Sequence, residues 1–460
     1  MNVSRTRRTA PGGLNTRRDQ LLQAPIVPTL LRLATPNILN LAALAGLIAF
    51  DGLFVGRLGT EALTGISLVF PWVMLVQHAA ASGVGGAVSS AIARALGEGN
   101  QQRADHLATH AVWLALLLGA LFASVMLLFG PMLYEAMGGR GQALAIAIAY
   151  STVAFSGIVA VWMLNLLGSV LRGTGEMTLP ALVIAGTVLL HVVLSPLLIF
   201  GAALGVRGAA WGLVCSFGAG SAVLAWKLRR GTWPVQLRLS GVPFQWRLIR
   251  EFLRVGVPGL LNVAITNLTV VALTALAARI GPEAAIAYAL GARLEYIVIP
   301  IGFGIGTGIV AMVGTNWGAR QHARAFAVAW AGASLAAVAC GAVGIFFALF
   351  PRLWMGIFTT DEAVIRLGAS YLAIVGPCYA FYGFGIGLYF ACQGLARLVP
   401  AVAANAARLL IAWCGGTVAV VMMDGSAAAL YASIAAGFAA YAGLTALVVL
   451  RFGRAGRRAS

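Results

Sequence analysis

Charge is scarce in this sequence of 460 residues. Only 10% of the residues are Asp, Glu, Lys or Arg, whereas 60% are hydrophobic. A soluble domain carries about a quarter charged residues. Apolar runs of about 20 residues recur along the chain, and each is long enough to cross a bilayer core. Ten-residue segments of alternating polarity, the pattern of outer-membrane strands, are missing. The composition therefore excludes a soluble protein and predicts an all-α integral membrane protein.

Signatures of cofactor and metal chemistry are also missing. The five cysteines lie singly in apolar runs without metal-ligand spacing, so they are expected to behave as small hydrophobic residues. The phosphate-binding pattern G-x-x-x-x-G-K-[ST] is absent, which excludes coupling to ATP on this chain. No DxxD, HExxH or GxSxG cluster is present either. We therefore expect no enzymatic activity, no metal and no cofactor.

Basic residues outnumber acidic ones, 31 to 13, and the formal net charge is +18. These residues lie between hydrophobic spans rather than on one basic face, which argues against a nucleic-acid partner. If the N-terminus is cytoplasmic, 23 basic residues fall in inner segments and six in outer loops. Since inner loops of membrane proteins are enriched in Lys and Arg, this bias predicts that both termini are cytoplasmic.

The apolar runs predict twelve transmembrane helices. They lie near residues 34–56, 63–93, 107–133, 143–168, 178–200, 206–227, 253–278, 285–314, 325–350, 364–392, 400–422 and 426–450. A polar linker, 228–250, separates an N-terminal six-helix lobe, 31–227, from a C-terminal lobe, 251–451. We expect residues 1–30 to be a disordered basic tail and residues 452–460 to be a second basic tail.

The two lobes repeat each other in sequence. Four pairs of blocks align at a nearly constant offset of 221 or 222 residues. The pairs are LATPNILN (33–40) with VGVPGLLN (255–262), GRLGTEAL (56–63) with ARIGPEAA (278–285), ARALGEGNQQRA (93–104) with GTNWGARQHARA (314–325), and LRGTGEMTLP (171–180) with CQGLARLVP (392–400). Two copies of six helices share one membrane orientation and enclose a cleft between them. That arrangement predicts an alternating-access transporter.

Two acidic residues lie well inside predicted spans, Asp51 in the first lobe and Glu295 in the second. A carboxylate inside a membrane is costly and is by default a functional-site hypothesis. An ionised carboxylate attracts a cationic cargo, and a proton from outside removes that attraction, so proton and cargo compete. Simpler roles stay open: Asp51 as a solvated acid near a helix end, and Glu295 as a structural ion pair. Which lobe carries the coupling ion also stays open.

The ordered motifs resemble the MATE family, the multidrug and toxic compound extrusion transporters. The likeness extends over about residues 30–452 and rests on five segments in order. They are VGRLGTEAL after Asp51, SGVGGAVSSAIARALGEGN, LRGTGEMTLP, GVRGAAWGL and VGTNWGARQHARA. The resemblance implies two six-helix bundles in a V, a bacterial inner-membrane location, and exchange of organic, usually cationic, compounds for protons or sodium. It also implies cation coupling at Asp51.

One segment departs from the family pattern. Many members carry an Asn and an Asp on the fifth helix, in a pattern like N-x-x-L-D-P, whereas this chain has LHVVLSPLLIF with His191 and Ser195. Either His191 bonds across helices, or it relays protons with Asp51, because an imidazole titrates near neutrality. Since one acid with His and Ser makes a poor oxygen cage for sodium, we favour protons over sodium.

Several polar or aromatic residues of the spans are candidates for the substrate cleft. Packing or hydrogen bonding between helices is an equal or better explanation for each of them. Tyr382 belongs to an aromatic stretch that is able to hold a cation over its rings. The candidates are Asn40, Gln77, His78, Ser195, Asn262, Asn267 and Tyr382.

Rival functions are an exporter of a lipid-linked saccharide or of an endogenous metabolite, a membrane enzyme, and a channel. A saccharide flippase needs interior cations for phosphate headgroups, and the sequence offers only Arg293 and Arg408 inside spans. We therefore expect a small-molecule cargo that is cationic or amphiphilic, and a chain that works as a monomer in the lipid bilayer.

Overall fold

The computed structural model describes residues 13–231, 233–238, 241–422 and 426–458, without the side chains of 13–16, 39–49 and 455–458. These residues form helices and connecting loops, with no strand among them. The elements are α1 (Gly13–Gln23), α2 (Ile26–Gly56), α3 (Thr60–His78), η1 (Ala79–Val84), α4 (Gly85–Gly97), α5 (Gln101–Ala136), α6 (Gly141–Ser156), α7 (Val159–Gly173), α8 (Thr178–Pro196), η2 (Leu197–Gly201), α9 (Val206–Arg229), α10 (Trp246–Ile280), α11 (Pro282–Ala292), α12 (Glu295–Gly318), α13 (His322–Leu349), α14 (Pro351–Met355), α15 (Glu362–Val375), α16 (Tyr379–Gly394), α17 (Val399–Met422) and α18 (Ala427–Arg458).

The predicted spans correspond to these helices. Nine helical stretches of the described chain are long and apolar enough to cross a membrane, and two bent pairs, α6 with α7 and α15 with α16, add two more. The pairs bend by 44° and 52°. Pro377 lies in the second break, where it has no backbone N–H to donate. With the 31-residue α2, the described helices account for the twelve predicted crossings.

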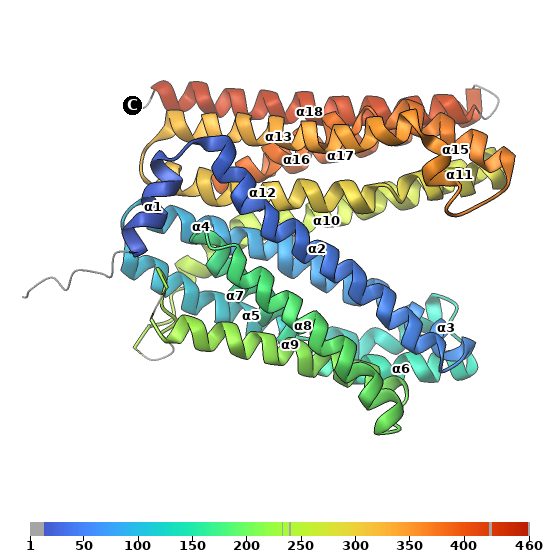
Figure 1. Cartoon of the computed structure of the whole chain (residues 1–460), viewed down its shortest axis with the longest axis horizontal. Coiled ribbons are helices and arrows are strands. Elements are labelled where there is room, and N and C mark those ends of the chain that lie inside the picture. The colour runs from blue at the N-terminus through green and yellow to red at the C-terminus, as the bar shows by residue number, and fades with distance from the viewer. Residues whose placement is uncertain (1–12, 232, 239–240, 423–425, 459–460) are drawn as a thin grey trace, which may run out of the picture.

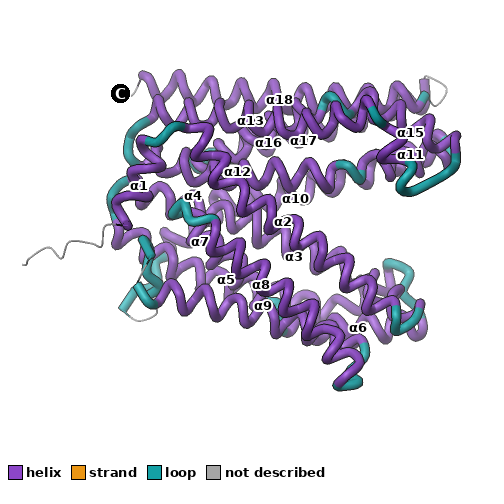
Figure 2. The backbone as a smooth tube through the Cα atoms, in the orientation of Figure 1, coloured by secondary structure: helices purple, strands orange, loops and turns teal. Residues whose placement is uncertain are grey.

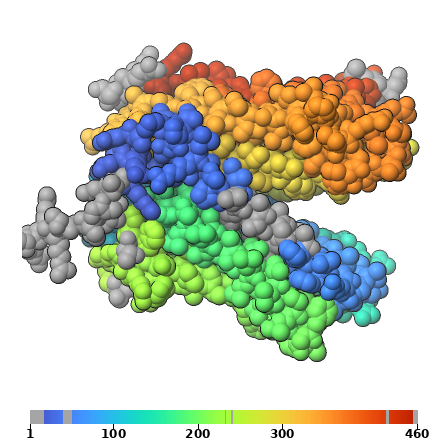
Figure 3. Space-filling view, in the orientation of Figure 1, coloured from blue at the N-terminus to red at the C-terminus, as the bar shows by residue number. Residues whose placement is uncertain are grey.

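The helices form two arms that diverge from one end, as the V-shaped prediction requires (Figure 1). One hydrophobic core joins α3 to α9, which we call the N-lobe, and another joins α10 to α18, which we call the C-lobe. The arms meet at the end that carries α1 and the C-terminus, here called the narrow end, and separate toward the wide end near α3, α6, α11 and α15 (Figures 1 and 2). The surface shows the wedge between them (Figure 3).

The first helix of each repeat crosses from one lobe to the other. In α2, Leu30 is part of the C-lobe core, whereas Val55 is part of the N-lobe core. In α10, Phe252 is part of the N-lobe core and Leu273 part of the C-lobe core. The boundaries of the sequence repeats therefore do not coincide with those of the packed lobes. Each repeat begins with a helix, α2 or α10, that packs in both lobes and so joins the two arms.

The predicted tails differ from the structure. Residues 13–23 form α1 and Ile26 begins α2, so the prediction of disorder is wrong for 13–30, while residues 1–12 lie outside the described part. The side chain of Arg18 donates to the carbonyl of Gly97 at 3.0 Å, and the amide of Asn316 donates to the carbonyl of Leu21 at 3.0 Å. These hydrogen bonds hold a polar segment in a helix, although its composition alone predicts disorder. At the other end, α18 continues to Arg458. The predicted linker, 228–250, overlaps the segment between α9, which ends at Arg229, and α10, which begins at Trp246.

The narrow end is sealed by contacts between repeat-related helices. A methyl group at Gly97 of α4 would overlap the backbone of Thr315 in α12, and one at Gly318 would overlap the backbone of Arg94. Glu251 of α10 holds Arg94 of α4 at 2.8 Å and Arg103 of α5 at 2.9 Å. The closely packed glycines thus join the lobes at this end, and the paired charges fix the start of α10 against α4 and α5 of the N-lobe.

Candidate functional site

The two acidic side chains predicted to act in transport lie in separate environments. Asp51 is near the wide-end terminus of α2, the helix that runs between the arms (Figure 1). Its Oδ1 lies 2.7 Å from Nε2 of His191 in α8. The His191 side chain is 1% exposed and that of Asp51 is 31% exposed, so the carboxylate connects a buried imidazole with the exterior.

The other ring nitrogen of His191 faces Ser216 rather than Ser195. Ser216 Oγ of α9 lies 3.4 Å from His191 Nδ1 and donates to the carbonyl of Gly212 at 2.6 Å. Ser195 is fully buried, and its hydroxyl has no hydrogen-bond partner among the described residues. Asp51, His191 and Ser216 therefore form a chain from α2 through α8 to α9. The sequence pattern missed Ser216, because nothing local distinguishes it from other helical serines.

Glu295 begins α12 and is half-buried in the C-lobe. It lines a cavity with Thr266, Tyr288 and Arg408, and the cavity has room for a water rather than for an organic molecule. No ion pair within 4.0 Å involves Glu295 in the described part of the chain. Arg293, the neighbouring cation, is instead exposed and lies 5.3 Å from the ring centre of Phe358.

The aromatic surface predicted at Tyr382 already holds a cation. The guanidinium of Arg408 in α17 lies 5.1 Å from the ring centre of Tyr382 and 5.6 Å from that of Phe438. Tyr382 is 5% exposed and stacks on Phe438 with ring centres 4.8 Å apart. The Tyr382 ring is therefore part of a buried arginine environment beside Glu295, and in this conformation it offers no free face to a cargo.

The other cleft candidates divide into two groups. Gln77 accepts a 3.4 Å hydrogen bond from the buried amide of Asn165, and Asn262 accepts one of 2.8 Å from Asn405. Both bonds join neighbouring helices, which fits the structural interpretation.

The remaining candidates bond within their own helices or lie outside the description. His78 Nδ1 lies 2.9 Å from the carbonyl of Met74, and the amide of Asn267 donates to the carbonyl of Val263 at 2.9 Å. Both side chains are exposed. The side chain of Asn40 lies outside the described residues.

The interior arginines differ from the prediction. Arg94, Arg172 and Arg408 are 8%, 7% and 3% exposed, respectively, whereas Arg293 is exposed. The sequence placed Arg94 and Arg172 on the cytoplasmic flanks because each is followed by a polar loop. The structure buries them between helices, since α4 and α7 continue past them to Gly97 and Gly173.

Comparisons with known proteins match this architecture. The MatE family model matches residues 36–197 and 258–416, one segment in each repeat. An "FAD transporter" of Shewanella oneidensis is 26% identical over 414 residues, which are 86% of this chain and 88% of that protein. A "Probable multidrug resistance protein NorM" of Thermotoga maritima is 28% identical over 357 residues, 76% of each chain.

The fold is shared with solved transporters. A transporter of the MOP superfamily from Pyrococcus furiosus superposes with a TM-score of 0.88 at 24% sequence identity, covering 98% of this chain and 99% of that one. The family model, the duplicated six-helix lobes and the V between them agree. The chain is therefore a multi-pass membrane protein that belongs to the MatE family, the multidrug and toxic compound extrusion transporters.

Proposed function

We propose that this transporter is a secondary active antiporter that exports organic cations or amphiphiles in exchange for protons. The observation that carries the proposal is the 2.7 Å contact between the half-buried Asp51 and the buried His191. A carboxylate and an imidazole in direct contact hold one proton between them and can accept a second. Loading and unloading of that second proton changes the charge that faces the cleft.

The alternation follows from competition at one site. With the pair singly protonated, Asp51 is ionised and attracts a cationic cargo. A second proton, arriving from the side with the higher proton concentration, neutralises the pair and removes its attraction for the cationic cargo, which favours release of the cargo. Because proton and cargo reduce each other's affinity, the gradient of one drives the movement of the other.

The partner of Asp51 favours protons over sodium. Sodium is a hard cation that selects oxygen ligands, as calcium and magnesium do. The nearest partner of Asp51 is a ring nitrogen, and among the described residues no further carboxylate joins this cluster. Glu295 is the alternative coupling group, because it lines a separate cavity in the C-lobe.

The membrane orientation is part of the same proposal. The excess of basic residues on the connections at the narrow end supports a cytoplasmic location for that end and for both termini in a bacterial cell. The wedge in Figure 3 then opens to the outside. In this conformation Asp51, near the wide end, is accessible to external protons.

The test is efflux of ethidium from right-side-out or reconstituted vesicles under a pH gradient and, separately, under a sodium gradient. We expect the pH gradient to drive efflux and Asp51→Asn to reduce it at least tenfold. Glu135→Gln is the matched control, because Glu135 is an exposed acid at the wide end. Full activity of Asp51→Asn together with loss in Glu295→Gln would move the coupling site to the C-lobe. Efflux driven by neither gradient would end the antiporter proposal.

A second candidate is the export of an endogenous metabolite. The similarity to the Shewanella oneidensis protein, whose printed name is FAD transporter, favours this alternative. The same vesicles loaded with FAD distinguish the two, since proton-driven release of FAD without release of ethidium supports only the second.

A further inference from the structure

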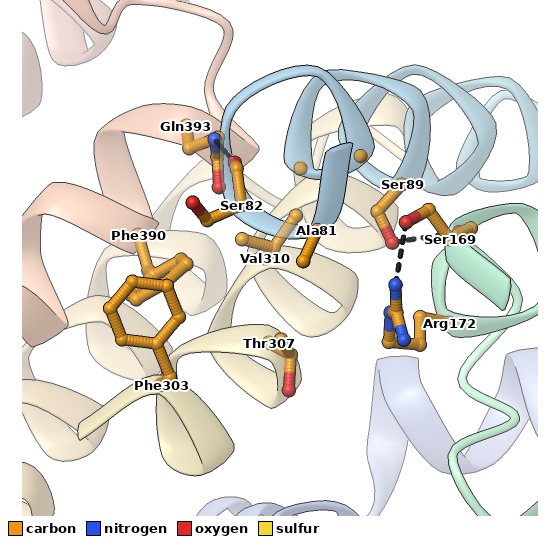
Figure 4. Close-up of a pocket in the computed structure, with 12 residues that line it drawn as sticks. Ala81, Ser82, Ser89, Ser169, Arg172, Phe303, Thr307, Val310, Phe390 and Gln393 are labelled. Carbon is orange, nitrogen blue, oxygen red and sulfur yellow. Dashed lines mark hydrogen bonds between the residues drawn. The ribbon is translucent and has the colours of Figure 1, made fainter. Parts of the chain in front are cut away.

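A cavity at the narrow end contains a buried cation that the proposed proton exchange does not use. The side chain of Arg172 in α7 is directed toward this cavity between the lobes (Figure 4). Arg172 is 7% exposed, and its Nη2 donates to Ser169 Oγ at 2.7 Å and to the carbonyl of Asn165 at 3.2 Å. No carboxylate lies within 4.0 Å of it in the described part of the chain.

The other two buried arginines are compensated. Arg94 pairs with Glu251 at 2.8 Å, and Arg408 lies against three aromatic rings in a cavity that Glu295 also lines. A buried charge without a partner is strongly destabilising, so an uncompensated guanidinium at a cavity between the two lobes calls for a function. Arginine is also the side chain best suited to bind a carboxylate or a phosphate, because its planar fork donates two parallel hydrogen bonds.

The wall opposite Arg172 is aromatic. Phe303 of α12 and Phe390 of α16 pack edge to face with ring centres 5.1 Å apart, and both line the cavity. Ser89 and Ser169 lie on the same side as Arg172, as Figure 4 shows. The cavity therefore has a cationic, hydroxyl-rich side from the N-lobe and a largely apolar side from the C-lobe.

This asymmetry arises from divergence of the duplicated halves. Ten of the lining residues are repeat mates at the offset of 221, so the cavity lies where corresponding positions of the two halves meet. The pairs are Ser82 with Phe303, Gly86 with Thr307, Ser89 with Val310, Ser169 with Phe390, and Arg172 with Gln393. In three of these pairs a serine of the N-lobe corresponds to an apolar residue of the C-lobe, and Arg172 corresponds to the neutral Gln393.

We propose that Arg172 binds the carboxylate or phosphate group of an amphiphilic organic anion, whose apolar part lies against Phe303 and Phe390. The closed cavity has room for a water or two rather than for such a molecule, so the anion enters when the lobes separate at the narrow end. A ligand that binds only the open form shifts the population toward it. The inference extends the proposed function by adding an anionic class of cargo.

The experiment measures binding without any gradient, so its result is independent of proton coupling. Purified protein is titrated calorimetrically with 1-naphthyl phosphate, 1-naphthaleneacetate and the neutral 1-naphthaleneethanol. We expect at least one anion to bind at least tenfold more tightly than the alcohol. Arg172→Gln removes that preference to within twofold, and Arg408→Gln retains it. Whichever anion shows the preference, the phosphate or the carboxylate, identifies the group that Arg172 recognises.

A second variant guards against misfolding of Arg172→Gln. Gln393→Glu is nearly isosteric and adds a carboxylate to the lining of the same cavity, so it cancels the net positive charge of that lining without removing Arg172, and we expect it to abolish the preference. Equal binding of the three probes to the parent overturns the proposal. It is also overturned if the preference survives in Gln393→Glu, or if Arg408→Gln removes it while Arg172→Gln does not.

Discussion

His191 has the most direct role in the proton exchange that we propose for this transporter. Its ring is buried, contacts Asp51 at 2.7 Å, and has Ser216 at 3.4 Å on the other side. Nε2 and Nδ1 therefore face groups on two different helices. A proton that makes the ring an imidazolium is stabilised by the Asp51 carboxylate. When Nδ1 loses its proton, this nitrogen becomes a hydrogen-bond acceptor on the side of Ser216.

At this scale we expect His191→Gln to separate cargo binding from proton coupling. Glutamine reaches Asp51 with an amide that donates a hydrogen bond but does not titrate. Ethidium efflux at a fixed pH gradient falls at least tenfold, while ethidium affinity, measured by calorimetry, stays within about threefold. His106→Gln is the control, because His106 is a half-buried histidine near the narrow end. Efflux equal to that of the parent would show that His191 only bridges α2 and α8.

The two helices that pack closely at the narrow end, α4 and α12, are repeat copies of each other. Gly97 in α4 and Gly318 in α12 are mates at the offset of 221, and each lies against the backbone of the other helix. Without side chains at these positions the two helices approach closely enough to seal the narrow end. A single added methyl group has no flexible neighbour that can yield, because the atoms it meets are backbone.

At the element scale we therefore expect Gly318→Ala to prevent tight closure of α4 on α12. Overpacking of this kind costs about 1–3 kcal/mol. A maleimide should label a cysteine introduced at Ser90, which is fully buried in the sealed state, several times faster in Gly318→Ala than in the parent. Both proteins carry serine at the native cysteine positions. Gly186→Ala is the control, since nothing lies within 4 Å of its added methyl group. Unchanged labelling would mean that the packing of α4 against α12 does not determine how tightly the narrow end closes.

Across the whole molecule, α1 contacts both lobes at the narrow end. Arg17 pairs with Glu176, and Arg18 donates to Gly97, both in the N-lobe. Asn316 of the C-lobe donates to the carbonyl of Leu21, and Arg324 to that of Ala24 just after α1. Since these bonds form together only when the lobes are adjacent, α1 stabilises the sealed narrow end.

We expect the double variant Arg17→Ala, Arg18→Ala to open the narrow end more often. Spin labels are placed at positions 229 and 454, which are exposed at the narrow end in the N-lobe and the C-lobe, respectively. The distance between the two labels, measured by double electron–electron resonance, reports the separation of the lobes. The variant should show a larger long-distance fraction than the parent. Asp19→Ala with Gln20→Ala, on the exposed face of α1, should leave the distribution unchanged. Identical distributions for all three proteins would exclude a clamping role.

The sequence by itself determined the membrane class, the helix positions and the duplication. These properties are local or periodic: hydropathy over 20 residues marks a span, and a constant offset of 221 or 222 marks a repeat. It also singled out Asp51 and His191, because a titratable group is expensive in an apolar helix wherever that helix packs.

Only the tertiary structure decided which distant side chains meet. Four features depend on how each helix is rotated about its axis and on how the two lobes are oriented. They are the contact of His191 with Asp51 and Ser216, the uncompensated burial of Arg172, the enclosure of Arg408 by aromatic rings and the ordering of α1. Arg172 shows the reason most clearly. A charge at the end of an apolar run is indistinguishable in sequence from a cytoplasmic flank, and its burial depends on the packing of the surrounding helices of both repeats.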